Sequence, residues 1–275
     1  YRQRDRLIVA PSKIRRDGRG VRIDVDGEDG ESLRQRLRAA YTAGYDRITV
    51  VPDGELPGET RRAIHRTVNT FIGMGIHEEA DVLVVRDHLD AGAVSPEQSL
   101  VQIRQLALGM QRDAVEAVRM NDEMLAGHVA ERDDHVDRLF AFISRSLHRG
   151  LEDVNELDRL NVTRRTAFHY YKIARELERI ADRAVRVADV AEAQSTRPDE
   201  SLGRTLRDAV AGAVDVVELA LSDGSGEAIE AYADVIDAVD ALDYELSGRA
   251  EPDAYLYGRV VESARRTAQR GVNVV

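Results

Sequence analysis

The 275-residue chain is rich in charge and poor in aromatic side chains: Asp, Glu, Lys and Arg make up 32%, aromatic residues 5%, and Trp is absent. This composition favours long, solvated helices packed through Ala, Val and Leu over a β-sandwich, and the length suggests two domains. The absence of Cys excludes disulfides, thiolate-bound zinc and iron–sulfur clusters. Any bound metal must therefore have oxygen or imidazole ligands.

The formal charge of −11 is unevenly distributed. Residues 1–20 hold seven Arg or Lys against two Asp, a net +5, so the rest of the chain carries −16. Such an acidic body is not expected to bind nucleic acid through its own field. The basic residues are almost all Arg, which together with the acidic surplus indicates a salt-adapted, halophile-like source. No apolar run is long enough for a membrane span and no signal peptide is evident, so we expect a cytoplasmic protein.

The first residues predict a short hairpin. Arg2 to Arg4 and Leu7 to Ala10 are strand candidates about a polar turn, and Pro11 stops the second. We treat residues 1–20 as this hairpin and a linker. The chain begins at Tyr1 without Met, so we expect that the natural N-terminus lies further upstream.

Residues 21–90 predict a small α/β domain. Strand candidates are residues 21–25, 47–51, 76–80 and 82–87, and helix candidates are residues 32–45 and 59–73, ending near Gly44 and Gly73. The order β-α-β-α-β-β indicates a mixed sheet covered by helices. No phosphate loop or dinucleotide motif is present. His65 and His77 lack a second ligand at helical spacing, so we expect each to be a surface or partly buried polar residue. We interpret the domain as a scaffold or effector module.

From residue 95 to 275 the chain predicts helices. Ser95 as N-cap, Pro96 at the first position and Gln98 at the third are a strong helix start. Asn121 is expected to cap the next helix, which ends near Gly150, and residues 151–162 are expected to be a linker or short turn. One apolar stripe on the first helix comprises Leu100, Ile103, Ala107, Met110, Ala114 and Ala117.

The helical pattern repeats. DAVEAV at 113–118 aligns with DVVELA at 215–220, HVD at 135–137 aligns with AVD at 238–240, and residues 263–275 stand where residues 176–188 stood. We therefore predict a mainly α protein in which the small α/β domain precedes a six-helix bundle of two three-helix repeats, residues 95–195 and 200–275.

Two pairs of carboxylates mark the first repeat. Glu178 and Asp182 lie one turn apart on the helix of residues 163–193, where like charges repel by a few tenths of a kcal/mol. Asp133 and Asp137 have the same spacing on the preceding helix, and Asp133 falls on its apolar stripe. Two such helices, packed side by side, can surround a cation.

A lattice of salt bridges is the alternative explanation for the second pair. Arg175, Arg179 and Arg186 stand three or four residues from Glu178 or Asp182, so they could neutralise these carboxylates at a solvated surface without any metal. The spacing alone leaves both explanations open.

ELERIADRAVRVAD, residues 176–189, resembles the LERIGD-type signature of the PhoU family, and DDHVD, residues 133–137, resembles the acidic pair on that family's preceding helix. The resemblance implies a regulator of phosphate uptake and phosphate-starvation signalling, not an enzyme. It nominates Asp133, Asp137, Glu178 and Asp182 as metal ligands. Carboxylates are compatible with iron, zinc, manganese or magnesium. The implied partners are a phosphate-transporter ATPase or the transcription machinery, and we expect a homodimer.

The second repeat departs from this signature. Arg265 and Gln269 stand at the positions of Glu178 and Asp182, and Ile236 stands at that of Asp133. Because Arg repels a cation and cannot ligate one, only the first repeat is expected to keep a metal site. Arg265 and Arg266 are instead expected to pair with Asp240 and Asp243.

Two other functions stay open. YRQRDRLIVAPSK is similar to the last hairpin of an AbrB-type DNA-binding domain, which often precedes archaeal-type PhoU domains. The protein could thus be a DNA-binding transcription regulator whose DNA-contacting head lies upstream of this chain. It could also be a carboxylate-bridged metalloenzyme, although the acidic helices lack the Glu-x-x-His motif of such bundles.

Overall fold

The computed structural model describes residues 2–3, 6–7, 18–25, 30–79, 82–88, 94–222, 224–249 and 252–274. The chain divides into two compact units, one of residues 1–99 with 138–171 and one of residues 100–137 with 172–275. Each unit is described by itself. Among the described residues, no helix is both long enough and apolar enough to cross a membrane.

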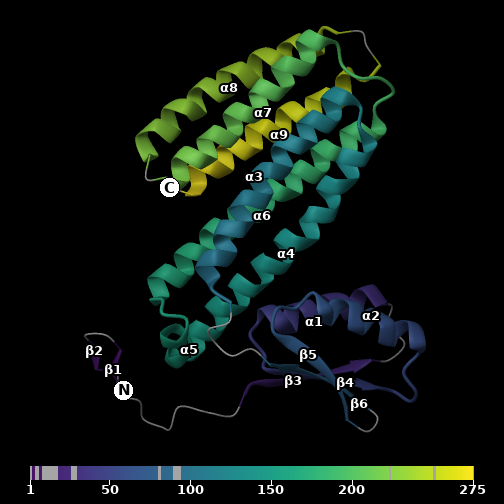
Figure 1. Ribbon diagram of the computed structural model, residues 1–275, viewed down its shortest axis with the longest axis vertical. Coiled ribbons are helices and arrows are strands. Elements are labelled where there is room, and N and C mark those ends of the chain that lie inside the picture. The colour runs from purple at the N-terminus through teal and green to yellow at the C-terminus, as the bar shows by residue number, and fades with distance from the viewer. Residues whose placement is uncertain are drawn as a thin grey trace. The chain divides into compact units, whose positions relative to one another are not determined.

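The first unit contains a four-stranded mixed sheet of β3 (Gly20–Val25), β4 (Arg47–Pro52), β5 (Met74–Glu79) and β6 (Val82–Asp87), in the order β3-β4-β6-β5. Strands β3 and β4 are parallel, and the other pairs are antiparallel. Helices α1 (Gly30–Thr42) and α2 (Gly58–Asn69) cover one face of the sheet (Figure 1). The predicted small β-α-β-α-β-β domain is confirmed.

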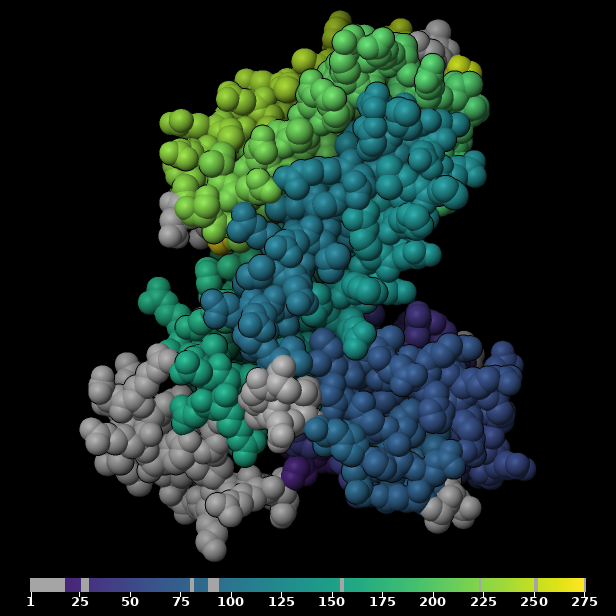
Figure 2. All heavy atoms as spheres, viewed as in Figure 1, coloured from purple at the N-terminus to yellow at the C-terminus, as the bar shows by residue number. Residues whose placement is uncertain are grey.

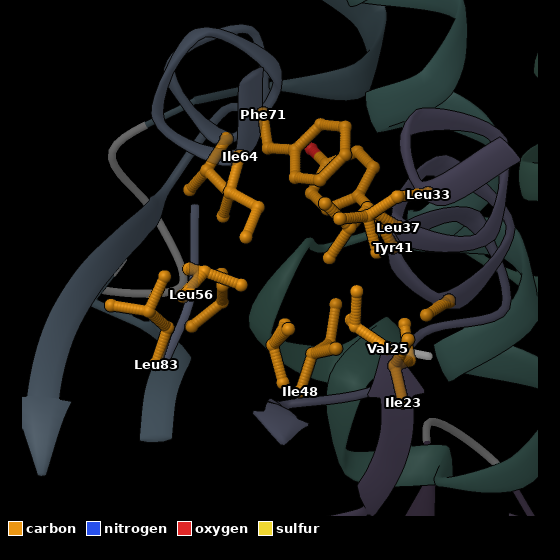
Figure 3. Close-up of a cluster of buried hydrophobic side chains, with 14 of the residues drawn as sticks. Ile23, Val25, Leu33, Leu37, Tyr41, Ile48, Leu56, Ile64, Phe71 and Leu83 are labelled. Atoms are coloured by element: carbon orange, nitrogen blue, oxygen red, sulfur yellow. The ribbon is translucent and has the colours of Figure 1, made fainter. Parts of the chain in front are cut away.

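The core of this sheet domain lies between the helices and the strands. Leu33 and Leu37 of α1 and Ile64 of α2 point toward Ile48 of β4 (Figure 3). The rings of Tyr41 and Phe71 stack with centroids 4.4 Å apart, and burial raises the pKa of Tyr41 well above its usual value. The Tyr41 hydroxyl is satisfied by donating to the Ile72 carbonyl, which a buried phenol requires.

The predicted helix end near Gly44 has a backbone reason, whereas the one near Gly73 is wrong because α2 ends at Asn69 with Thr70 as its C-cap. Gly44 and Gly73 both have positive φ, +87° and +82°, a conformation that glycine adopts without a steric penalty, and Gly73 uses it in the turn before β5. A side chain at Gly44 would also come within 2.9 Å of Arg149 Cγ.

Two arginines of α4 (Glu123–Glu152) bind the sheet domain within the first unit. Arg145 is almost fully buried, donates to the carbonyls of Tyr41 and Tyr45 at 3.0 and 2.8 Å, and pairs with Asp87 at 2.9 Å. Arg149 pairs with Asp87 and with Asp46. These contacts supply partners for buried charged and polar groups, whose burial without partners would destabilise the folded protein.

Two other segments belong to the first unit. β1 (Arg2–Gln3) and β2 (Arg6–Leu7) form an antiparallel hairpin, as predicted, although the second strand begins one residue earlier. Residues 4–5 and 8–17, including most of the predicted second strand, lie outside the described residues. The segment 151–162, expected to be a linker or short turn, contains the short helix α5 (Val154–Arg159).

The helical region contains six long helices in two sets of three. The first set is α3 (Pro96–Met120), α4 and α6 (Arg164–Ala193), and the second is α7 (Glu200–Leu221), α8 (Ser225–Ser247) and α9 (Ala254–Val274). Helices α7, α8 and α9 pack against one another (Figure 1). Helices α3 and α7 lie side by side in Figure 2, joined by an ion pair of 2.8 Å between Arg112 and Glu218.

Apolar residues at helical spacing form the interior of this bundle. On α6 such a stripe is buried throughout: Ile173, Leu177, Ile180, Ala184, Val187 and Ala191. On α4 the stripe is Val136, Phe140, Ile143 and Leu147. On α3 the stripe is buried from Ile103 to Ala117, whereas Leu100 is only half-buried, and Phe140 is the half-buried member of the α4 stripe. Gln111 of α3 donates to the Ile180 carbonyl of α6 at 2.6 Å.

Of the two predicted N-caps, one is confirmed and the other is wrong. Ser95 Oγ accepts from the Gln98 backbone N–H at 3.4 Å, as predicted. The predicted cap at Asn121 is wrong: Asp122 accepts from the Leu125 N–H at 3.0 Å and begins α4. Asn121 ends α3 with a positive φ of 56°, which Asn tolerates better than most residues.

Candidate functional site

The four predicted ligands stand on two helices of the second unit, at the edge of its apolar interior. Glu178 and Asp182 of α6 are half-buried and flank the fully buried Ile180. Asp133 and Asp137 of α4 are also half-buried. Because a helix has 3.6 residues per turn, each pair projects from one face beside the stripe that packs the bundle.

The carboxylates of both helices act on Glu178. Burial is the largest cause that raises its pKa to about 7, followed by the charges of Asp182 and Asp137. Arg179 opposes the shift, and Asp133 adds to it. The charges of both α4 carboxylates thus reach Glu178 across the gap between the two helices.

Asp182 shows the same effect. Burial and the charge of Asp137 raise its pKa, while Arg186, Arg183 and Arg179 offset part of the shift. Arg179 does not pair with Asp182; it donates to Glu176 at 3.4 Å. In the described part of the chain neither Glu178 nor Asp182 has an ion-pair partner within 4.0 Å, yet Arg179 lowers the pKa of both carboxyls. The salt-bridge lattice and the metal site therefore both stay predictions.

The four carboxylates have the right donor atoms for a cation, but their positions do not form a binding site. Carboxylate oxygens suit hard divalent ions, and a cation would relieve the repulsion that raises the pKa values of Glu178 and Asp182. Across the described ranges, however, no three His, Asp or Glu side chains stand close enough together to hold one ion. As they stand, the four side chains do not form a coordination sphere, and the metal site stays a prediction.

The second repeat replaces this site by neutral and paired contacts. Arg265 of α9 pairs with Asp240 of α8 at 2.5 Å, as predicted. Tyr232 donates to Gln269 Oε1 at 2.8 Å. The expected pairing of Arg266 with Asp243 is wrong, because Arg266 pairs with Glu262 of its own helix at 2.6 Å.

His65 and His77 are exposed, as expected, but His77 has a histidine neighbour that the sequence did not indicate. Its Nε2 lies 2.5 Å from Nε2 of His88, which follows β6. The two residues lie on neighbouring strands, and the register of the β5–β6 pair brings them together. The sequence analysis predicted both strands but not their register, so it missed this contact.

With this geometry established, the chain can be compared with known proteins. Residues 100–191 match the PhoU domain family model. All four carboxylates and α6 up to Ala191 lie inside this PhoU match, and the second repeat lies outside it. The matched segment is thus the one that carries the signature residues, whereas α8 and α9 have lost them.

A solved structure supports the PhoU-like fold. The chain is similar to the phosphate transport system regulatory protein PhoU from Streptococcus pneumoniae, with a TM-score of 0.51 and 18% identity, over 65% of this chain and 89% of that one. At this identity the similarity shows the fold alone. No curated protein matches the chain. The architecture is a mainly helical, PhoU-like bundle preceded by a small mixed-sheet domain.

Proposed function

We propose that this protein is a PhoU-like regulator of phosphate uptake and of phosphate-responsive signalling or transcription, acting in the cytoplasm through protein contacts and not as an enzyme. The observation that carries the proposal is the PhoU domain match at residues 100–191, because that segment contains both acidic pairs. The PhoU-like fold of the bundle adds support.

The proposal includes a cation between α4 and α6. Asp133, Asp137, Glu178 and Asp182 are its candidate ligands, and their side chains would have to move closer together to bind it. The ion would supply the positive charge that lowers the pKa values of Glu178 and Asp182. Mg²⁺ and Mn²⁺ fit such oxygen donors and retain water ligands, so an incomplete protein shell is compatible with them; iron and zinc are the other candidates. A bound cation would attach α4 to α6 and stabilise the first repeat.

The partners are inferred from charge and family. An acidic surface on a chain of net charge −11 suits a basic protein surface better than free phosphate. We infer that the partner is the ATPase of a phosphate transporter or a component of the transcription machinery, and that the protein acts as a homodimer.

A deletion strain tests this function. Phosphate uptake and phosphate-responsive transcripts are measured with phosphate in excess and limiting, after complementation with the wild type, with Asp137→Asn/Glu178→Gln, or with Glu230→Gln/Asp237→Asn, a control with the same charge change at exposed α8 positions. We expect the wild type and the control to restore regulation and the first double variant to fail. Unchanged uptake and transcripts in the deletion strain would overturn the proposal.

The N-terminal hairpin favours a second candidate function. The β1–β2 pair and the net +5 of residues 1–20 support an AbrB-like DNA-binding head encoded upstream, with the helical bundle acting as its sensor or dimeriser. Electrophoretic mobility of promoter DNA with the product of the whole gene, compared with this chain, tests it. Binding by neither protein would reject this candidate and leave the first intact.

A further inference from the structure

The outer face of the sheet, away from α1 and α2, carries two histidines in direct contact. His77 lies on β5 and His88 follows β6, and both rings are exposed. Their Nε2 atoms are 2.5 Å apart, the ring centroids 4.7 Å apart, and the ring planes are tilted by 59°. The two nitrogens therefore point at each other from neighbouring strands.

Two glycines make this contact possible. His88 donates its backbone N–H to the Gly73 carbonyl at 2.8 Å, which extends the antiparallel pairing of β5 and β6 by one residue. Gly73, Gly75 and His77 then alternate onto the same face as His88. A Cβ at Gly75 would lie 2.6 Å from Cδ2 and 2.9 Å from Nε2 of His88. The bare strand at Gly75 thus provides the space across which the His88 ring reaches His77.

We propose that His77 and His88 form a two-imidazole binding site for a divalent transition-metal ion of the Zn²⁺, Ni²⁺ or Cu²⁺ class. Two nitrogens bound to a tetrahedral ion at about 2.0–2.1 Å stand about 3.3 Å apart. The rings need to separate by less than about 1 Å from the present contact to admit the ion, and water completes its shell. Imidazole selects these ions over Mg²⁺, which prefers oxygen.

The site is distinct from the acidic pairs in residues and in ligand chemistry. It uses no carboxylate, and it lies in the first unit, whereas the carboxylates lie in the second. The two carboxylates of the same strand are engaged in ion pairs, Glu78 with Arg61 and Glu79 with Arg47 and Arg86. Among the described residues the two histidines are therefore the proposed protein ligands, and loss of either one removes half of them.

Calorimetric titration of tag-free, chelator-stripped full chain with Zn²⁺, and separately with Mg²⁺, tests the proposal. His77→Asn and His88→Asn are each expected to lower the Zn²⁺ affinity at least about tenfold, with no effect on Mg²⁺ binding. His65→Asn, at an exposed position of α2, is the matched control and is expected to bind as the wild type does.

Two further variants make the result specific. Gly75→Ala keeps both ligands but fills the space under the His88 ring, so it is expected to weaken Zn²⁺ binding without altering the circular dichroism spectrum. Asp137→Asn/Glu178→Gln is expected to leave the effect of the histidine variants unchanged. If His77→Asn and His88→Asn both retain the wild-type Zn²⁺ affinity, or if the wild type binds no Zn²⁺, the proposal is wrong.

Discussion

Replacing Glu178 by Gln tests the electrostatics of the acidic pairs. The carboxyl of Glu178 has a pKa of about 7 in the folded protein, raised from 4.5 by burial, Asp182 and Asp137. A raised carboxyl pKa means that the folded state holds the proton more tightly than the unfolded chain does. The ionised Glu178 is therefore destabilising, and this cost is absent below pH 4.5, grows as the pH rises, and is complete above pH 7.

The magnitude follows from the two pKa values. The interval from 4.5 to about 7, at about 1.4 kcal/mol for each pH unit, corresponds to about 3 kcal/mol at most. Glu178 is only partly buried, so screening by solvent reduces this to about 1–2 kcal/mol. Gln keeps the size of the side chain and removes the charge, so it is expected to stabilise the metal-free protein by that amount at about pH 8.

Urea unfolding at about pH 5 and pH 8, in the presence of a chelator, measures the effect. Glu178→Gln is expected to have nearly the wild-type free energy of unfolding at pH 5 and a higher one at pH 8. Glu230→Gln, at an exposed position of α8, is the control and should change neither. A destabilised Glu178→Gln protein at pH 8, or an equal effect at both pH values, would refute the convergence of carboxylates on Glu178.

Other contacts give further predictions. Arg145→Met removes the ion pair with Asp87 and two hydrogen bonds to backbone carbonyls, so it should lower the free energy of unfolding by about 3 kcal/mol. The control Arg138→Met, at an exposed α4 position, should change this free energy little. Equal midpoints of urea unfolding for the two variants would contradict the buried network around Arg145. Arg265→Glu breaks the ion pair with Asp240 and places a like charge beside it. Thermal unfolding should therefore show a loss of about 1 kcal/mol in the free energy of unfolding. An unchanged melting temperature would show that this ion pair does not contribute to stability.

Much of the architecture was predictable because it depends on local patterns. The six apolar residues of α6 recur at helical spacing, and all are buried in the structure. The strand and helix order of the sheet domain followed from short alternating or apolar runs between turn residues. Gly44 was recognisable as a position just past a helix end because the left-handed conformation found there strongly favours glycine.

The features that the sequence did not predict depend on residues far away along the chain or on a choice between adjacent residues of similar propensity. Arg145 has no distinctive local pattern, and its partners stand 58 and about 100 residues away along the chain. Asn121 and Asp122 are both good caps, and only the turn geometry decides between them. The contact of His77 with His88 needs the strand register and a missing side chain at Gly75, neither of which periodicity reveals.

The candidate site stays a prediction whose side-chain detail the sequence could not supply. Helical spacing placed each acidic pair on one face, and the PhoU resemblance indicated that the two faces meet. Neither the spacing nor the resemblance could show that Arg179 pairs with Glu176, so that Asp182 has no ion pair in the described part of the chain. Several arginines stand at equivalent helical spacing, and spacing alone does not choose among them. Side-chain competition of this kind is decided by tertiary packing.

The metal content of the purified protein tests the central claim most directly. Stripped protein is reloaded with Mn²⁺, dialysed and analysed by inductively coupled plasma mass spectrometry, as wild type, as Asp137→Asn/Glu178→Gln and as the control Glu230→Gln/Asp237→Asn. Wild type and control are predicted to retain at least about one ion per chain that the Asp137→Asn/Glu178→Gln protein loses. Equal metal content in all three proteins would contradict a cation held between α4 and α6.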